Sequence, residues 1–177
     1  MSWTSKLTVN LFGGPGVGKS TLACLLYAEL KKQYIETEYL SDTARTLILE
    51  GNIKGVENNI YLFGLQLHEL SCAYEVSQVV ICDSPMLLGA IYRPWVSDVL
   101  PDLILEQHNK FNNLNILLAR GDVDYSEVGR MHSLVESIQL DRDIEDYLDK
   151  KHIPYRHWDS FTMDVGSLAE IVKAAIE

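Results

Sequence analysis

Short apolar runs alternate with longer amphipathic segments along most of the chain. The apolar runs predict strands at 7–12, 78–82 and 115–119, and the more polar segments 36–40 and 155–158 are predicted as the second and fifth strands. Apolar residues at helical spacing predict helices over 21–30, 43–51, 57–76, about 131–150 and 166–176. Strands that alternate with helices in this way are typical of an α/β fold with a mostly parallel sheet. The continuous apolar run at 78–82 suits a central strand of that sheet.

Length and composition indicate one compact domain. The chain has 177 residues, of which 47% are hydrophobic, enough to bury a single core. No apolar run reaches the roughly 18 residues of a membrane span. Residues 1–6 lead directly into the first predicted strand and leave no room for a signal peptide. We therefore expect a cytoplasmic protein with a single domain over residues 1–177.

The cysteines are also consistent with a cytoplasmic protein. Cys24, Cys72 and Cys82 lie in apolar segments and lack the spacing of a metal site. This pattern predicts buried free thiols, which are usual in a reducing cytoplasm.

The formal net charge of −10 limits the choice of partners. Nonspecific binding to nucleic acid depends on Lys and Arg that neutralise phosphates, so an acidic chain is disfavoured as such a binder. The same charge disfavours adhesion to anionic membranes. A local basic cleft on the acidic protein stays open as an alternative.

The most specific motif lies between the first predicted strand and the first predicted helix. It has the form Gly-x-x-x-x-Gly-Lys-Ser, and a strand–loop–helix context distinguishes such a phosphate loop from a chance glycine-rich turn. The residues expected to bind ATP are Gly13, Gly14, Pro15, Gly16, Val17, Gly18, Lys19, Ser20 and Thr21. Backbone N–H groups and the helix N-terminus would hold the phosphates. Lys19 would reach the β- and γ-phosphates, and the Ser20 hydroxyl would bind Mg²⁺.

A carboxylate follows the third predicted strand. Asp83 occupies the position expected for a Mg²⁺-associated carboxylate in a phosphate-loop protein. Alternatively, Asp83 caps a following helix, because Ser84 and Pro85 suit a helix start. The two roles are compatible.

Several features of hydrolytic and guanine-binding proteins are missing from the sequence. Ser84 follows Asp83, where a hydrolytic enzyme usually carries a Glu that activates water. Residues 109–112 read Asn-Lys-Phe-Asn and lack the final Asp of a guanine-reading motif. The chain is also short for a motor ATPase with a helical subdomain. These observations favour transfer of a phosphoryl group to an acceptor other than water.

A second charged pair follows the second predicted strand. Asp42 lies at the carboxyl-end crevice where open α/β sheets bind ligands, and Arg45 follows one helical turn later. Asp42 could accept the proton of an acceptor hydroxyl, while Arg45 could hold a phosphate or orient Asp42. The alternative is a helix N-cap with a surface arginine, since Asp is a good cap.

The chain resembles the small phosphate-loop kinases that act on nucleosides and nucleotides, in particular the ribosylnicotinamide kinase domain and its phage and bacterial relatives. That family carries Glu-x-x-Arg after its second strand, and Asp42-Thr43-Ala44-Arg45 matches this motif with Asp in place of Glu. The lid of that family carries arginines that close on the phosphates. Here the matching residues, in the same order, are Arg120, Tyr125, Gly129 and Arg130. The resemblance implies a three-layer P-loop NTPase sandwich with a five-stranded sheet and a helical lid at about 120–140. It also implies that Arg120 and Arg130 neutralise phosphate charge.

The acceptor pocket is expected between the third and fourth strands. Tyr92, Arg93 and Trp95 are candidates, because an aromatic ring and an arginine can stack on and hydrogen-bond a base. Aromatic residues beside Pro94 also serve as ordinary packing, so both interpretations stay open.

Together these residues predict an ATP- and Mg²⁺-dependent phosphotransferase. Its acceptor would be a hydroxyl of a nucleoside, a nucleotide or a related small molecule. One alternative is a phage-type kinase, active in the host cytoplasm, that phosphorylates a 5-hydroxymethyl base (5-hydroxymethyluracil) in DNA, although the acidic net charge weakens it. Another alternative is a regulatory ATP-binding switch or ATPase, against which Ser84 and the paired lid arginines count.

Overall fold

A single parallel sheet forms the centre of the protein. The computed structural model describes residues 5–92, 97–121, 133–159 and 164–177, and every structural statement below concerns these residues. The strands are β1 (Leu7–Phe12), β2 (Thr37–Leu40), β3 (Val79–Cys82), β4 (Asn113–Ala119) and β5 (Arg156–Asp159). Their order is β2-β3-β1-β4-β5, and all four pairings are parallel. The predicted α/β fold with five strands is confirmed.

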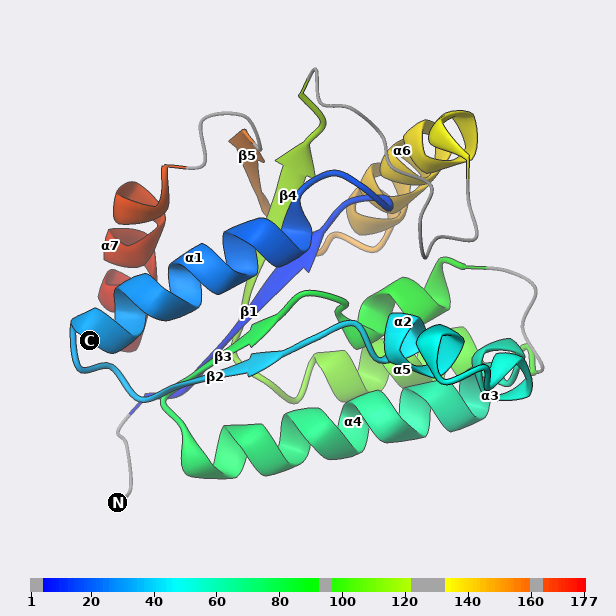
Figure 1. Cartoon of the computed structure of the whole chain (residues 1–177), viewed down its shortest axis with the longest axis horizontal. Coiled ribbons are helices and arrows are strands. Elements are labelled where there is room, and N and C mark those ends of the chain that lie inside the picture. The colour runs from blue at the N-terminus through cyan, green and yellow to red at the C-terminus, as the bar shows by residue number, and fades with distance from the viewer. Residues whose placement is uncertain (1–4, 93–96, 122–132, 160–163) are drawn as a thin grey trace.

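Helices cover both faces of this sheet and complete three layers (Figure 1). α1 (Lys19–Lys32) and α7 (Val165–Ile176) pack together on one face. The opposite face carries α4 (Asn59–Val76), the 3-10 helix η1 (Met86–Ala90), α5 (Leu100–His108) and α6 (Leu134–Lys150). The short helices α2 (Thr43–Leu49) and α3 (Ile53–Glu57) connect β2 to α4. Among the described residues, none of the helices combines the length and the apolar character needed to cross a membrane.

The alternation of side chains along β1 supplies both layers of the core. Val9 and Leu11 are fully buried and belong to the cluster formed with α1 and α7. Phe12 is also fully buried but packs in the opposite cluster, with α4, α5 and α6. Because successive strand residues point to opposite faces, β1 is buried on both sides, and its two polar residues, Thr8 and Asn10, are buried with the apolar ones. β1 therefore ends in a rigid, buried segment directly before the glycine-rich loop.

The structure differs from the sequence predictions at several points. The predicted helix over 57–76 begins two residues later, as α4 at Asn59, because the Asn58 side chain accepts a hydrogen bond from the N–H of Tyr61 and caps it. The short helix α3, the 3-10 helix η1 and helix α5 were not predicted. The prediction of three buried thiols was wrong for Cys24 and Cys72, which are exposed, and correct for Cys82. Helical geometry explains this, since Leu22 and Ala23 turn toward the core while Cys24 points outward.

Candidate functional site

The loop between β1 and α1 has the backbone conformation of a phosphate cradle. Gly13, Gly16 and Gly18 have φ angles of 140°, 81° and 99°. Residues with a side chain rarely adopt these angles, so glycine is required at each of the three positions. The loop turns sharply from the buried end of β1 into the first turn of α1.

The N-terminus of α1 is left open for an anion. Gly18 is its N-cap, no side chain accepts a hydrogen bond there, and the first turn carries no acidic residue. By contrast, the N-termini of α2, α4, α6 and α7 are capped by the side chains of Asp42, Asn58, Ser133 and Asp164. Backbone N–H groups in the first turn of a helix need a partner, and phosphate oxygens are suitable ones. The geometry therefore fits the phosphates of a nucleotide.

Lys19 lies at the centre of the charged groups. Its ammonium donates hydrogen bonds to the carbonyl oxygens of Gly13 at 2.7 Å and Gly14 at 3.0 Å. Burial lowers its pKa, and the nearby carboxylates of Asp83, Asp42 and Asp141 oppose this effect. Three carboxylates from different elements thus act on one lysine of the phosphate loop.

Asp83 and Ser20 are brought together as the sequence predicts. Asp83 is buried at the carboxyl end of β3, with 3% of its surface exposed. Burial raises the pKa of its carboxyl group, whereas a hydrogen bond from Ser20 and the charge of Lys19 lower it. The capping alternative for Asp83 is not observed, because the N-cap of η1 is Pro85 and no side chain caps it. A hydroxyl and a carboxylate side by side form an oxygen pair of the kind that Mg²⁺ prefers.

Of the two roles considered for Asp42, the helix cap is the one that the structure shows. As the N-cap of α2, its Oδ1 accepts a hydrogen bond from the N–H of Arg45 at 3.2 Å. Its charge also raises the pKa of Lys19 and of Asp83, so the carboxylate lies near the phosphate loop as well. The side chain of Arg45 is exposed on the first turn of α2. The proposed functions of both residues stay predictions.

Tyr92 lies close to this charged centre and lines a cleft of about 740 Å³. Burial raises the pKa of its phenol, and the charges of Asp42 and Asp141 raise it further. The cleft lies between the η1–α5 segment and α6. Four aspartates and two lysines contribute to its lining: Asp98, Asp102, Asp143, Asp146, Lys150 and Lys151. The other two acceptor candidates, Arg93 and Trp95, lie outside the described residues.

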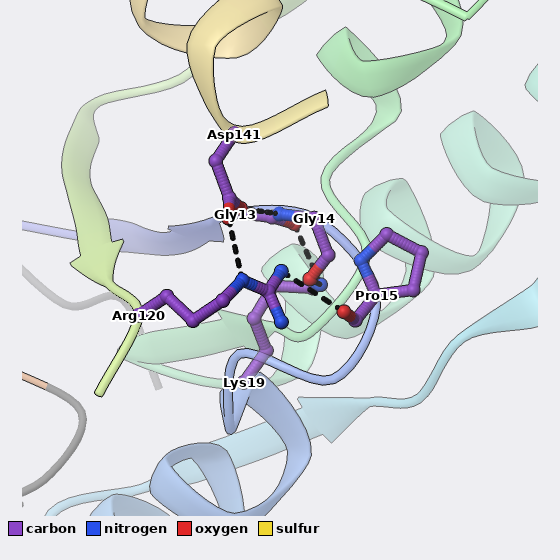
Figure 2. A network of polar contacts seen from close by, with 6 residues as sticks. All are labelled: Gly13, Gly14, Pro15, Lys19, Arg120 and Asp141. Atoms are coloured by element: carbon purple, nitrogen blue, oxygen red, sulfur yellow. Dashed lines mark hydrogen bonds and ion pairs between the residues drawn. The ribbon is translucent and has the colours of Figure 1, made fainter. Parts of the chain in front are cut away.

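Arg120 directly follows β4 and is held against the phosphate loop (Figure 2). Its Nε donates to Oδ2 of Asp141 at 2.7 Å, and its Nη2 donates to the carbonyl oxygen of Pro15 at 3.0 Å. The other carboxylate oxygen of Asp141 accepts a hydrogen bond from the N–H of Gly14. Arg130, like Tyr125 and Gly129, lies outside the described residues.

Asp141 is a site residue that no sequence motif indicates. α6 carries Asp141, Asp143, Asp146 and Asp149, and no motif distinguishes one of them from the others. Helical spacing alone does not show which of these carboxylates faces Gly14. The packing of α6 beside the loop singles out Asp141.

The fold and the loop together define a P-loop NTPase. The glycine-rich loop joins β1 to α1 on a parallel sheet, and an aspartate ends the neighbouring strand β3. The sequence matches the model of the AAA domain family over residues 8–161, and the chain belongs to this family. No curated protein sequence matches the chain.

Solved structures with a similar fold include nucleoside and nucleotide kinases. Thymidylate kinase from Ehrlichia chaffeensis superposes with a TM-score of 0.59 at 10% identity, covering 96% of this chain and 99% of that one. Deoxyadenosine kinase from M. mycoides, with products dCMP and dCDP bound, gives 0.52 at 16% identity, covering 94% and 96%. The protein APE1195 gives 0.54 at 22% identity, covering 98% of each chain. At these identities the likeness concerns the fold, and the finer resemblance to ribosylnicotinamide and phage kinases stays a prediction.

Proposed function

We propose that this protein transfers the γ-phosphate of ATP to a hydroxyl group of a small nucleoside-like acceptor. The observation that carries the proposal is the presence of two separate carboxylates around Lys19. Asp83 is buried beside Ser20, where a metal would be held, while Asp42 lies on a different element at the same edge of the sheet. One carboxylate for the metal leaves the other for the acceptor.

Each residue has a distinct task in this reaction. The N–H groups at the start of α1 would bind phosphate oxygens, and Lys19 would exchange the carbonyl oxygens of Gly13 and Gly14 for the β- and γ-phosphates. Ser20 and Asp83 would hold Mg²⁺, which supplies charge neutralisation between these phosphates when it is bound. Phosphoryl transfer depends mainly on such positioning and charge neutralisation.

Asp42 would act as the base. As the acceptor oxygen forms its bond to the γ-phosphorus, the bond from phosphorus to the β–γ bridging oxygen breaks and leaves ADP. The proton of the acceptor hydroxyl passes to the Asp42 carboxylate. Arg45, Arg120 and Arg130 would neutralise the charge on the transferred group.

The lining of the cleft supports an acceptor without phosphate groups. Among the lining residues that the structure describes, Asp98, Asp102, Asp143 and Asp146 outnumber the two lysines, and Lys151 already lies 3.6 Å from Asp102. An acidic cleft repels phosphates and accommodates a neutral or positively charged nucleoside. Tyr92 connects this cleft to the phosphate loop, because the charges of Asp42 and Asp141 also raise the pKa of its phenol. The similar fold of a deoxyadenosine kinase agrees with a nucleoside acceptor.

A product screen tests the proposal. The protein would be incubated with Mg²⁺ and γ-labelled ATP together with nucleosides, nucleotides, or DNA that contains 5-hydroxymethyluracil. We expect label in a nucleoside monophosphate. Label in DNA would instead support the DNA kinase, and release of labelled phosphate without transfer to any acceptor would support the ATPase.

A further inference from the structure

Helix α6 packs against the phosphate loop at Gly14. A Cβ atom added to Gly14 would overlap the carbonyl oxygen of Ser137 and would lie 2.9 Å from Oδ1 of Asp141. Gly14 occupies a position that the Gly-x-x-x-x-Gly-Lys-Ser pattern leaves free, and its φ angle is not among the positive ones. Its glycine is therefore explained by the close approach of α6 rather than by the phosphates.

Asp141 uses both of its oxygens at this contact. Oδ1 accepts from the N–H of Gly14, and Oδ2 pairs with Nε of Arg120 at 2.7 Å. The same guanidinium reaches the carbonyl oxygen of Pro15 through Nη2, so it is held at two points (Figure 2). The side chains of Arg120 and Asp141 are only 14% and 21% exposed. A charge-assisted hydrogen bond that is largely shielded from water fixes orientation more firmly than an exposed ion pair does.

This contact acts on the group that binds phosphates. The charges of Asp141 and Arg120 both reach Lys19, in opposite directions. α6 is a firm support for the carboxylate, since Ser133 and Glu136 form a reciprocal capping box at its start and Ile144 and Leu148 are fully buried. The orientation of Arg120 therefore depends on where α6 lies.

We propose that Asp141 is a positioning residue for phosphoryl transfer, which holds the Arg120 guanidinium over the phosphate loop and couples helix α6 to it. This inference rests on the proposed function, because Arg120 is useful there only if it neutralises a phosphate. In this role Asp141 acts through Arg120 and needs no contact of its own with the nucleotide.

A double-mutant cycle of Asp141→Asn and Arg120→Ala tests the proposal. The rate of γ-phosphate release from Mg²⁺-ATP is measured with the nucleoside that the product screen identifies as the acceptor, or with water as the acceptor if no nucleoside is phosphorylated. Calorimetry gives the affinity for a non-hydrolysable ATP analogue. We expect each single variant to slow release on the order of 10- to 100-fold, as misplacement of a catalytic group does. The double variant should be no slower than Arg120→Ala alone.

The matched control is Asp149→Asn, the same change on the same helix. Asp149 is exposed and accepts a hydrogen bond from the Tyr155 hydroxyl at 3.0 Å, far from the loop. It should keep the wild-type rate. If Asp141 has a purely structural role, Asp141→Asn lowers the melting temperature, and the rate losses of the two single variants multiply in the double variant. Such multiplication overturns the proposal, and so does a wild-type rate in Asp141→Asn.

Two further outcomes keep the test decisive. If Asp141→Asn does not fold, as judged by circular dichroism, Asp141→Glu replaces it, because it keeps the charge and moves the carboxylate by one methylene. A wild-type rate in folded Asp141→Glu would then contradict the positioning role. If the wild-type protein itself releases γ-phosphate neither to water nor to any nucleoside, the proposed function is wrong, which is a different result from a tolerant Asp141.

Discussion

The hydroxyl of Tyr39 lies 3.3 Å from Oδ2 of Asp83 and donates a hydrogen bond to it. The two residues come from neighbouring parallel strands, since Tyr39 on β2 is in register with Ile81 on β3. Burial and the charge of Asp83 raise the pKa of Tyr39, so its phenol stays protonated and remains a donor. The carboxylate proposed to hold Mg²⁺ is therefore oriented from two sides, by Ser20 on the loop and by Tyr39 on the sheet.

This arrangement predicts a graded metal requirement. Asp83→Asn should raise the Mg²⁺ concentration needed for half-maximal activity strongly, because the charged metal partner is lost. Tyr39→Phe should raise it on the order of 10-fold, since loss of a residue that orients a metal ligand typically costs 10- to 100-fold in metal affinity. Turnover measured against Mg²⁺ concentration at saturating ATP shows which variant needs more metal. An unchanged requirement in Asp83→Asn would show that Asp83 does not serve the metal.

Lys19→Ala should reduce turnover by about 10³-fold, the usual loss for a group that stabilises charge in the transition state. The fold should survive, since Lys19 is only half-buried and contacts its own loop. Thermal melting and steady-state kinetics on the same preparation measure both properties. Wild-type turnover in this variant would contradict the phosphate-loop assignment.

Asp42→Asn separates the proposed base from the helix cap. Asparagine caps helices about as well as aspartate, so α2 should remain intact while transfer falls about 10²- to 10⁴-fold. Binding of Mg²⁺-ATP, measured by calorimetry, should stay near normal. Asp164→Asn on α7 is the matched control, because Asp164 caps its helix through the N–H of Ser167 at 3.1 Å and should tolerate the change. If Asp42→Asn transfers phosphate normally, the base lies elsewhere.

Arg120→Ala and Arg130→Ala should lower turnover far more than they lower affinity for ATP. Both arginines are proposed to act on charge that develops during transfer, so their loss should appear mainly in kcat. Comparing kcat with the calorimetric dissociation constant of an ATP analogue measures the split. Equal losses in both quantities would mean that the arginines bind the ground state only.

Burial of His108 leads us to expect that the protein loses stability in mild acid. It is 3% exposed at the end of α5, and burial lowers its pKa from 6.5 to about 4. Between pH 6.5 and 4 the unfolded chain binds a proton that the folded protein excludes, so the free energy of unfolding decreases as the pH falls through this window. The loss at this residue should be on the order of 3 kcal/mol across the whole window. Urea unfolding of wild type and His108→Gln from pH 7 to 4 measures it, and parallel profiles would contradict the assignment.

The sequence by itself determined the sheet and the phosphate loop. All five strands lie within about two residues of the predicted segments. For β1, β3 and β4 the signal is a mainly apolar, buried run, which is a local property of the sequence, whereas β2 and β5 are more polar and more exposed. The need for glycine at positions 13, 16 and 18 is also local, since each of these residues has a positive φ angle at its own position. Asp83 and Asp42 could be placed at one edge because the carboxyl ends of parallel strands meet there.

Only the tertiary structure decided which distant side chains meet. Asp141 contacts Gly14 across 127 positions, and Pro15 contacts Arg120 across 105. Nothing in the local sequence of α6 distinguishes Asp141 from its neighbours at 143, 146 and 149, since all four are aspartates on an amphipathic helix. The exposure of Cys24 and Cys72 and the acidic lining of the cleft were missed for the same reason. Such features depend on how a helix rotates and packs against the sheet, and that choice is made by the whole core rather than by any one segment.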